Sequence, residues 1–99
     1  MMIPGSRFPL GRLVMTTNLE TQLKESDPEG WQDDLNLMVA RHAMGDWGEM
    51  SEGDKELNEE GLTGEGRLHS AYTSKGIKVW IITEHDRSIT TCLLPEGAL

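Results

Sequence analysis

Cysteine, proline and aromatic residues are scarce: among 99 residues the chain has one cysteine, four prolines and five aromatic side chains. The single cysteine, Cys92, excludes an internal disulfide framework and a zinc site made of several cysteines. No apolar run approaches the roughly 18 residues of a membrane-spanning helix, and Met1–Leu13 lacks the features of a signal peptide. We therefore expect one small cytoplasmic domain over residues 1–99, with no metal ion and no cofactor.

Basic residues are also in the minority, and the excess of acid is concentrated in one part of the chain. Seventeen acidic residues face nine lysines and arginines, for a net charge of −8. Residues 16–65 hold 14 of the acids and three of the bases, whereas the flanking stretches are almost neutral. Such a field repels phosphate backbones, which argues against direct nucleic-acid binding, and it attracts basic protein surfaces. A plainer explanation is solubility, together with acids placed at helix N-termini.

Periodicity and capping signals predict a strand and up to three helices in the first two thirds of the chain. The strand is expected over residues 8–15, at a sheet edge, and the helices over 17–23, 31–44 and 51–60. Ser51 and Asp54 have the spacing of a capping box, and Gly45 is placed to end the second helix in a left-handed conformation. The helix over 31–44 should pack on the sheet through Leu35, Met38 and Val39.

The last third is rich in isoleucine, valine, threonine, tyrosine and tryptophan, which favour strands. Strands are expected over residues 67–73, 77–83 and 89–94, joined by short polar turns. Connections this short produce antiparallel pairing, since parallel strands need long crossovers. The predicted fold class is therefore α+β, with two to three short helices packed on one face of a small antiparallel β-meander.

Two local runs are candidates for function. Gly45-Asp46-Trp47-Gly48 is either a structural corner, in which Trp47 covers the core and Asp46 pairs with Arg41, or an aromatic anchor for a partner. The run over residues 83–91 gathers ionisable and hydroxyl groups around one turn. It is either a solvated hairpin or a functional segment, which would be a recognition surface or a catalytic edge.

The histidines and the cysteine give weak chemical signals. His42, His69 and His85 lie on an expected helix, strand and turn, and none has a second ligand at the spacing of a metal site on one helix. His42 lies on the apolar side of its helix, where a buried histidine with satisfied hydrogen bonds is the simpler interpretation. Cys92 is more simply a small buried apolar side chain than a nucleophile.

A linked set of residues resembles a family of small bacterial proteins, with no assigned activity, that are carried on plasmids, prophages and integrative elements. The resemblance covers about residues 8–95, and it implies that residues 1–7 are a flexible N-terminal extension. The matching positions are Arg41-His42, Gly45-Asp46-Trp47-Gly48, Asn58, Ser70-Ala71-Tyr72, Lys78-Val79-Trp80-Ile81-Ile82-Thr83-Glu84, Asp86-Arg87-Ser88, Thr90-Thr91 and Leu93-Leu94-Pro95.

Three hypotheses for function follow. The first is a non-enzymatic inhibitor of a host defence protein, of the anti-restriction or anti-CRISPR kind, that places its carboxylates in a basic nucleic-acid groove of a nuclease or defence complex. The binding residues expected for it are Asp46, Trp47, Glu49, Glu52, Asp54, Glu56, Glu59, Glu60, Glu84, Asp86 and Arg87.

The other two hypotheses belong to different classes. One is a structural or regulatory subunit that forms homo- or hetero-oligomers through an exposed strand edge, with Trp31 or Trp47 in the contact. The other is a small ribonuclease toxin of the barnase or RelE type, whose charge is wrong for an unaided RNA binder. In that alternative, His42 is the general base, Lys78 and Arg87 stabilise the phosphorane, and Thr90 or Thr91 orients it.

Overall fold

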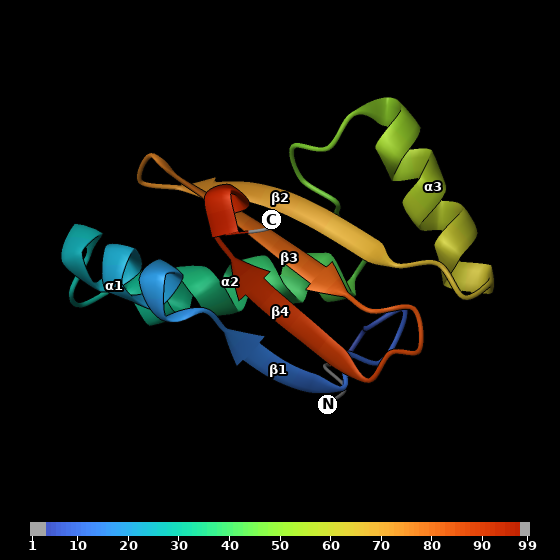
Figure 1. The fold of residues 1–99 in the computed structure, drawn as a ribbon, viewed down its shortest axis with the longest axis horizontal. Coiled ribbons are helices and arrows are strands. Elements are labelled where there is room, and N and C mark those ends of the chain that lie inside the picture. Colours follow the sequence, from blue (N-terminus) through green and yellow to red (C-terminus); the bar gives the residue numbers. More distant parts are fainter. Residues whose placement is uncertain (1–3, 98–99) are drawn as a thin grey trace.

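The structure is a computed structural model that describes residues 4–97 and confirms the α+β class (Figure 1). Its elements follow the predicted order, with bounds that differ from the predicted ones by a few residues. They are β1 (Arg12–Met15), α1 (Thr17–Ser26), α2 (Trp31–Ala43), α3 (Glu52–Thr63), β2 (Leu68–Ser74), β3 (Ile77–Thr83), β4 (Ile89–Leu93) and a final 3-10 turn (Pro95–Gly97). Among these described residues, no helix has the length and hydropathy needed to cross a bilayer.

The four strands form one mixed sheet in the order β1-β4-β3-β2. The predicted antiparallel meander is confirmed, with Ala71 opposite Trp80 and Trp80 opposite Leu93. The sheet is larger than the meander, because β1 joins it in parallel with β4, with Leu13 opposite Thr90. The pairing of β1 with β4 was not predicted, since the two strands are separated by all three helices and the first hairpin.

Gly11 explains how β1 reaches β4. Its φ is +65°, in the left-handed region, and a Cβ at this position would collide with the backbone of Arg87 and Ser88. A residue with a side chain would therefore push β1 away from the turn that precedes β4. The N–H of Arg12 then donates to the Ser88 carbonyl at 3.0 Å, which begins the parallel pairing.

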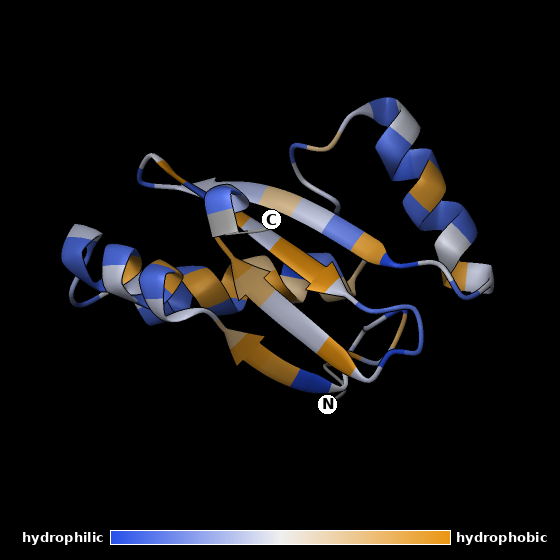
Figure 2. Ribbon diagram, viewed as in Figure 1, coloured by the Kyte–Doolittle hydropathy of each residue, from blue (hydrophilic) through white to orange (hydrophobic). Residues whose placement is uncertain are grey.

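One face of the sheet, here called the core face, is covered by α2, which passes behind the strands in Figure 1, and by α1, which packs against α2 at the end of the sheet. The predicted contact of α2 through Met38 and Val39 is confirmed, since both are buried, and Leu35 is partly buried beside them. Figure 2 shows the apolar residues of the strands that supply this layer. The sheet contributes Leu68, Tyr72, Val79, Ile81 and Cys92 to the core, and the two helices add Leu19, Leu23, Trp31 and Ala43.

The third helix is placed differently from the prediction that all the helices cover one face. In Figure 1, α3 stands beside β2, apart from α1 and α2. It begins as expected, because the Ser51 hydroxyl accepts a hydrogen bond from the Asp54 N–H at 3.1 Å. It lies along the edge of β2, and its Asp54 and Leu57 border the opposite face of the sheet, here called the outer face. Alternation along the strands places His69, Lys78 and Trp80 on this outer face.

The edge of β2 is closed by the segment that leads into α3 and by α3 itself. Trp47 and Glu49 bond the backbone of Ala71, at 3.2 and 2.7 Å. Two residues earlier on β2, the His69 carbonyl accepts from the Asn58 side chain of α3 at 2.8 Å, and the His69 N–H donates to the same side chain at 3.0 Å. These bonds occupy backbone groups of an edge strand and fix α3 along it.

Arg7, the last residue of the expected N-terminal extension, is bonded to the body of the protein. The Arg7 N–H donates to the Ala43 carbonyl at 2.8 Å, and the Arg7 guanidinium pairs with Glu59 of α3. Phe8 is buried in the core directly after it. Residues 1–3 lie outside the described part of the chain.

Candidate functional site

A groove of about 610 Å³ opens between α3 and the outer face of the sheet. Asp54 and Leu57 line its α3 side, and His69, Ala71 and Trp80 form its floor. The floor residues come together because Ala71 and Trp80 are directly paired across β2 and β3, with His69 two positions along β2. The His69 and Trp80 rings meet edge to face, with centroids 4.6 Å apart.

His69 is the polar group of this floor that lacks a partner. Its Nε2 is buried, and no hydrogen bond reaches it from any residue between 4 and 97. Burial lowers the pKa of the ring, and Arg67 lowers it further, whereas Asp54 acts in the opposite direction. His69 is therefore a neutral ring beneath the groove that retains an unused polar atom.

Most charges around the groove are paired within the protein. Lys78 Nζ lies 2.6 Å from Glu49 Oε1, and this hydrogen bond is the main reason why the pKa of Glu49 is lowered. Arg67 Nη2 lies 3.2 Å from Glu84 Oε2. Asp54 has no ion-pair partner in the described part of the chain. The groove therefore keeps one uncompensated carboxylate, on its α3 side.

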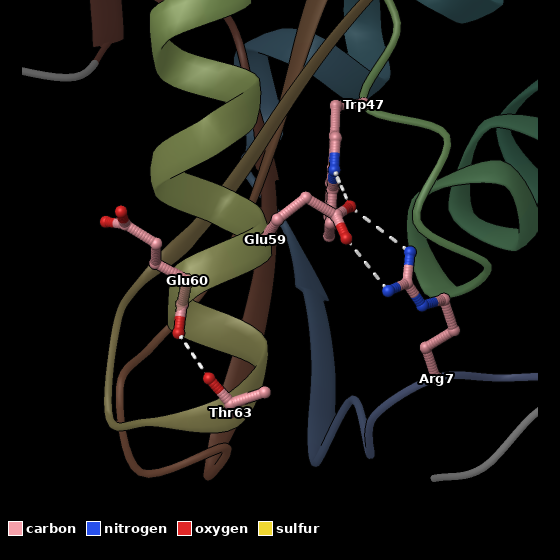
Figure 3. A network of polar contacts seen from close by, with 5 residues as sticks. All are labelled: Arg7, Trp47, Glu59, Glu60 and Thr63. Atoms are coloured by element: carbon pink, nitrogen blue, oxygen red, sulfur yellow. Dashed lines mark hydrogen bonds and ion pairs between the residues drawn. The ribbon is translucent and has the colours of Figure 1, made fainter.

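On α3 itself, the acidic residues fall into two groups. Glu59 is held in a clamp (Figure 3): its carboxylate accepts from Arg7 at 2.9 and 3.2 Å and from the Trp47 indole at 2.8 Å. These hydrogen bonds lower the pKa of Glu59, with that from Arg7 as the larger cause. Glu52 lies 3.6 Å from Lys55 and is largely exposed, so this pair contributes little.

Two of the remaining acids of α3 flank an exposed apolar side chain. Leu57 is 62% exposed, and Asp54 and Glu60 are its i−3 and i+3 neighbours on the helix. Glu56 is exposed on the same helix, and neither Glu56 nor Glu60 has an ion-pair partner among residues 4–97. We call Asp54, Glu56, Leu57 and Glu60 the acidic ridge.

The structure corrects the assignment of Trp47 as a surface anchor. Trp47 is 4% exposed, with its ring stacked on Phe8 at 6.2 Å between centroids. Its environment is the structural corner that was one of the two predicted alternatives for this run. Arg41 pairs with Asp46 at 2.7 Å, and the Tyr72 hydroxyl donates to the Asp46 carbonyl. A buried ring cannot be offered to a partner, so Trp47 is a core residue. Trp31, which is 8% exposed, is likewise unavailable as an oligomer contact.

His42 lies inside the protein, at the centre of a chain of hydrogen bonds. Its Nδ1 is 2.5 Å from the Ser70 hydroxyl and its Nε2 is 2.9 Å from the Thr83 hydroxyl. Thr83 is 2.6 Å from Thr90, whose hydroxyl donates to the Leu10 carbonyl at 2.7 Å. Since each hydroxyl has one proton, Thr83 donates to Thr90 and accepts from Nε2–H of His42, while Nδ1 accepts from Ser70.

The buried chain keeps His42 uncharged. Burial, with a smaller contribution from His69, lowers the pKa of His42 to about 3. The ring is fully enclosed and both of its nitrogens have partners, so no substrate reaches it. The buried-histidine interpretation accounts for this geometry, and the assignment of His42 as a general base does not.

The other residues of the ribonuclease hypothesis do not join His42 in one site. Thr90 is buried in the same chain, whereas Lys78 lies on the outer face against Glu49. Arg87 is occupied by backbone carbonyls, donating to Gly66 at 2.6 Å and to Gly61 at 2.7 Å. It thereby fastens the turn before β4 to the end of α3. Thr91 alternates with Thr90 along β4 and therefore points to the outer face.

The remaining candidates of the 83–91 run have local roles. The Asp86 side chain accepts from the Ser88 N–H at 3.0 Å, which closes the turn. The Ser88 side chain, and then this backbone N–H, lower the pKa of Asp86 by hydrogen bonding. Glu84 pairs with Arg67, as described above. These contacts correspond to the solvated-hairpin alternative. We therefore do not include Glu84, Asp86 and Arg87 in the acidic ridge.

The chain matches no protein-family model, no curated protein and no solved structure. Within residues 4–97, no group of three or more histidine, cysteine, aspartate or glutamate side chains is arranged to hold a metal ion. Cys92 is buried, and burial raises the pKa of its thiol to about 12, so it is not a thiolate at neutral pH. The groove and the acidic ridge are candidate binding features.

Reasoning from sequence missed Trp80, His69 and Leu57 as site residues. Alternation along residues 67–73 and 77–83 was the available signal, since it separates His69 and Trp80 from the core positions. The signal was incomplete, because nothing local indicates that α3 docks beside β2 on the outer face.

Proposed function

We propose that the chain is a non-enzymatic protein-binding accessory protein and that it contacts a basic surface of its partner through the acidic ridge. The observation that carries this proposal is the exposed Leu57 between the unpaired carboxylates of Asp54 and Glu60. Exposed apolar side chains supply binding energy when a partner covers them, and surrounding charges select the partner and speed its approach. The carboxylates of Asp54, Glu56 and Glu60 repel one another in the free protein, and a basic partner would reduce this repulsion.

We further propose that the partner is a nucleic-acid-binding enzyme and that the chain inhibits it. Carboxylates spaced along one helix offer negative charge to a groove built for phosphates, and the same charge keeps nucleic acid away from the chain itself. The resemblance to proteins of plasmids and prophages supports a host defence nuclease as the target. This role places the chain in the cytoplasm, where the buried Cys92 stays reduced.

The experiment is a comparative capture from an extract of the cells that carry the gene. Three forms are immobilised: the wild type, the variant E56K/E60K, and the control E25K/E29K, which makes the same charge change at exposed positions outside α3. We expect a basic protein that the wild type and the control retain and that E56K/E60K loses at least tenfold. Equal capture by all three forms would contradict the proposal, provided that circular dichroism shows the same fold.

A second candidate, an oligomerising subunit, is favoured by the position of β1. This strand forms one edge of the sheet, and Leu13 on it is 37% exposed. Edge strands pair readily with a second chain. The N–H groups of Arg12 and Thr16 bond β4, so by alternation the Leu13 N–H faces the open edge. Light scattering tests self-association: a concentration-dependent rise in mass that the variant L13P abolishes supports it, and a constant 11.0 kDa excludes it.

A further inference from the structure

We propose that the groove between α3 and the outer face is the specificity site of this binding surface, and that it receives an apolar side chain flanked by arginine or lysine in an extended segment of the partner. The inference rests on the proposed function, because it names what the same partner would insert beside the acidic ridge. From the sequence, none of the groove residues was expected to bind an apolar side chain of a partner.

The groove has an apolar floor large enough for a side chain. Its volume of about 610 Å³ lies over Trp80 and Ala71, and Leu57 and Met50 add apolar surface to its walls. Trp80 is only partly buried although it is the largest side chain of the outer face. A partly exposed tryptophan in a hollow beside an exposed leucine is the arrangement in which a partner's apolar anchor removes the most water.

The charges decide what must flank that apolar side chain. Lys78 and Arg67 line the groove, but Glu49 and Glu84 neutralise them at 2.6 and 3.2 Å. Asp54, which also lines the groove, has no ion-pair partner in the described part of the chain. An incoming acidic residue would be repelled by this carboxylate, whereas an arginine or lysine would pair with it. The groove therefore discriminates in favour of a basic segment.

His69 adds ring surface to the floor. Its imidazole lines the groove and meets the Trp80 ring edge to face, with centroids 4.6 Å apart. Its Nε2 is buried and is therefore turned away from a ligand in the groove. The floor thus offers ring surface, and not a hydrogen bond from Nε2, to an incoming apolar side chain.

The test is an NMR titration of the ¹⁵N-labelled protein with three capped pentapeptides. The first is arginine–serine–leucine–serine–arginine, the second replaces its leucine by serine, and the third replaces both arginines by glutamate. We expect saturable shifts of the Trp80 indole N–H and of the Asp54 and Leu57 amides with the first peptide. Binding of the other two peptides should be at least fivefold weaker, since each lacks one of the two features that the groove selects.

Matched variants locate the contact. L57A removes the leucine of the ridge, and L37A removes a leucine of equal exposure, 61% against 62%, that lies on α2. We expect L57A to weaken the first peptide at least threefold and L37A to leave it unchanged. Trp80→Phe, which keeps an aromatic ring, checks any loss seen with Trp80→Ala.

The outcomes separate this inference from the proposed function. Equal binding of the leucine and serine peptides, with shifts confined to Glu56 and Glu60, would overturn the groove as a receptor and leave the acidic ridge as a charged contact. The absence of any shift with the basic peptides, or a preference for the glutamate peptide, would also overturn the groove. The proposed function itself is decided by the capture experiment with E56K/E60K.

Discussion

The two faces of the sheet differ in the burial and hydrogen bonding of the histidine and tryptophan that lie on each. On the core face, His42 has both ring nitrogens bonded and Trp47 is 4% exposed, with its indole N–H on Glu59. On the outer face, His69 has a nitrogen without a partner and Trp80 is only partly buried at the floor of a groove. The comparison shows that the histidine and tryptophan that looked most functional in the sequence are enclosed in the fold, while their counterparts line a groove.

The largest expected effect compares the two tryptophans. Trp47→Ala should lower the free energy of unfolding by about 3–5 kcal/mol, because it opens a cavity beside Phe8 and removes a hydrogen bond from Glu59. Trp80→Ala should cost less than about 2 kcal/mol, because part of its ring is already in water. Urea denaturation of both variants measures the difference. Equal losses would mean that Trp80 belongs to the core after all.

The second prediction concerns acid and the buried histidine. His42 binds a proton at a pKa of about 3 in the folded protein and 6.5 in the unfolded chain. Below pH 6.5 the unfolded chain therefore binds the extra proton, and stability falls as the pH falls, by about 1.4 kcal/mol per unit. The lowered pKa of His69 acts in the same direction.

Two measurements separate these contributions. Urea denaturation between pH 7 and about pH 5.5 stays above the range in which the carboxylates with lowered pKa values, among them Glu59 and Asp46, lose their contribution. NMR of the imidazole rings should show His42 neutral throughout this range, with Nε2 protonated. A His42 ring that titrates near pH 6.5 would refute the closed hydrogen-bond chain.

These cases show what the sequence allowed and where it stopped. The start of α3 could be predicted from Ser51 and Asp54, because a capping box is a local pattern. The antiparallel meander could be predicted from the short turns between its strands. The parallel pairing of β1 with β4 depends on Gly11 meeting the backbone of Arg87 and Ser88, a contact between distant segments. Local patterns therefore predicted the elements, and only tertiary contacts determined which face each element occupies.

The site follows the same division. The acidic excess of residues 16–65 includes the acids of α3. The sequence did not indicate that Glu59 is bonded to Arg7 and Trp47 within the protein. The groove depends on the bonds between Asn58 and the backbone of His69, which no spacing in the sequence reveals. Periodicity distinguishes the two faces of a strand, yet it does not say which face a helix will cover.

The third prediction is the smallest in stability and sharpens the role of the clamp. Arg7→Ala should cost about 1 kcal/mol or less, because both partners are nearly half exposed and water screens the pair. Its clearer effect should be faster amide hydrogen exchange in the last turns of α3, where Glu59 loses its anchor. Arg12→Ala, which removes another exposed arginine, is the control. Identical exchange in the two variants would show that the clamp does not hold α3.

The most direct test of the acidic ridge is the association rate of the captured partner at two salt concentrations. Wild type should associate more slowly at high salt, because salt screens the attraction between the ridge and a basic surface. E56K/E60K should associate more slowly than wild type at low salt and depend less on salt, while E25K/E29K should lose less of the rate. Association that does not respond to salt and is unchanged in E56K/E60K would contradict the ridge as the binding surface.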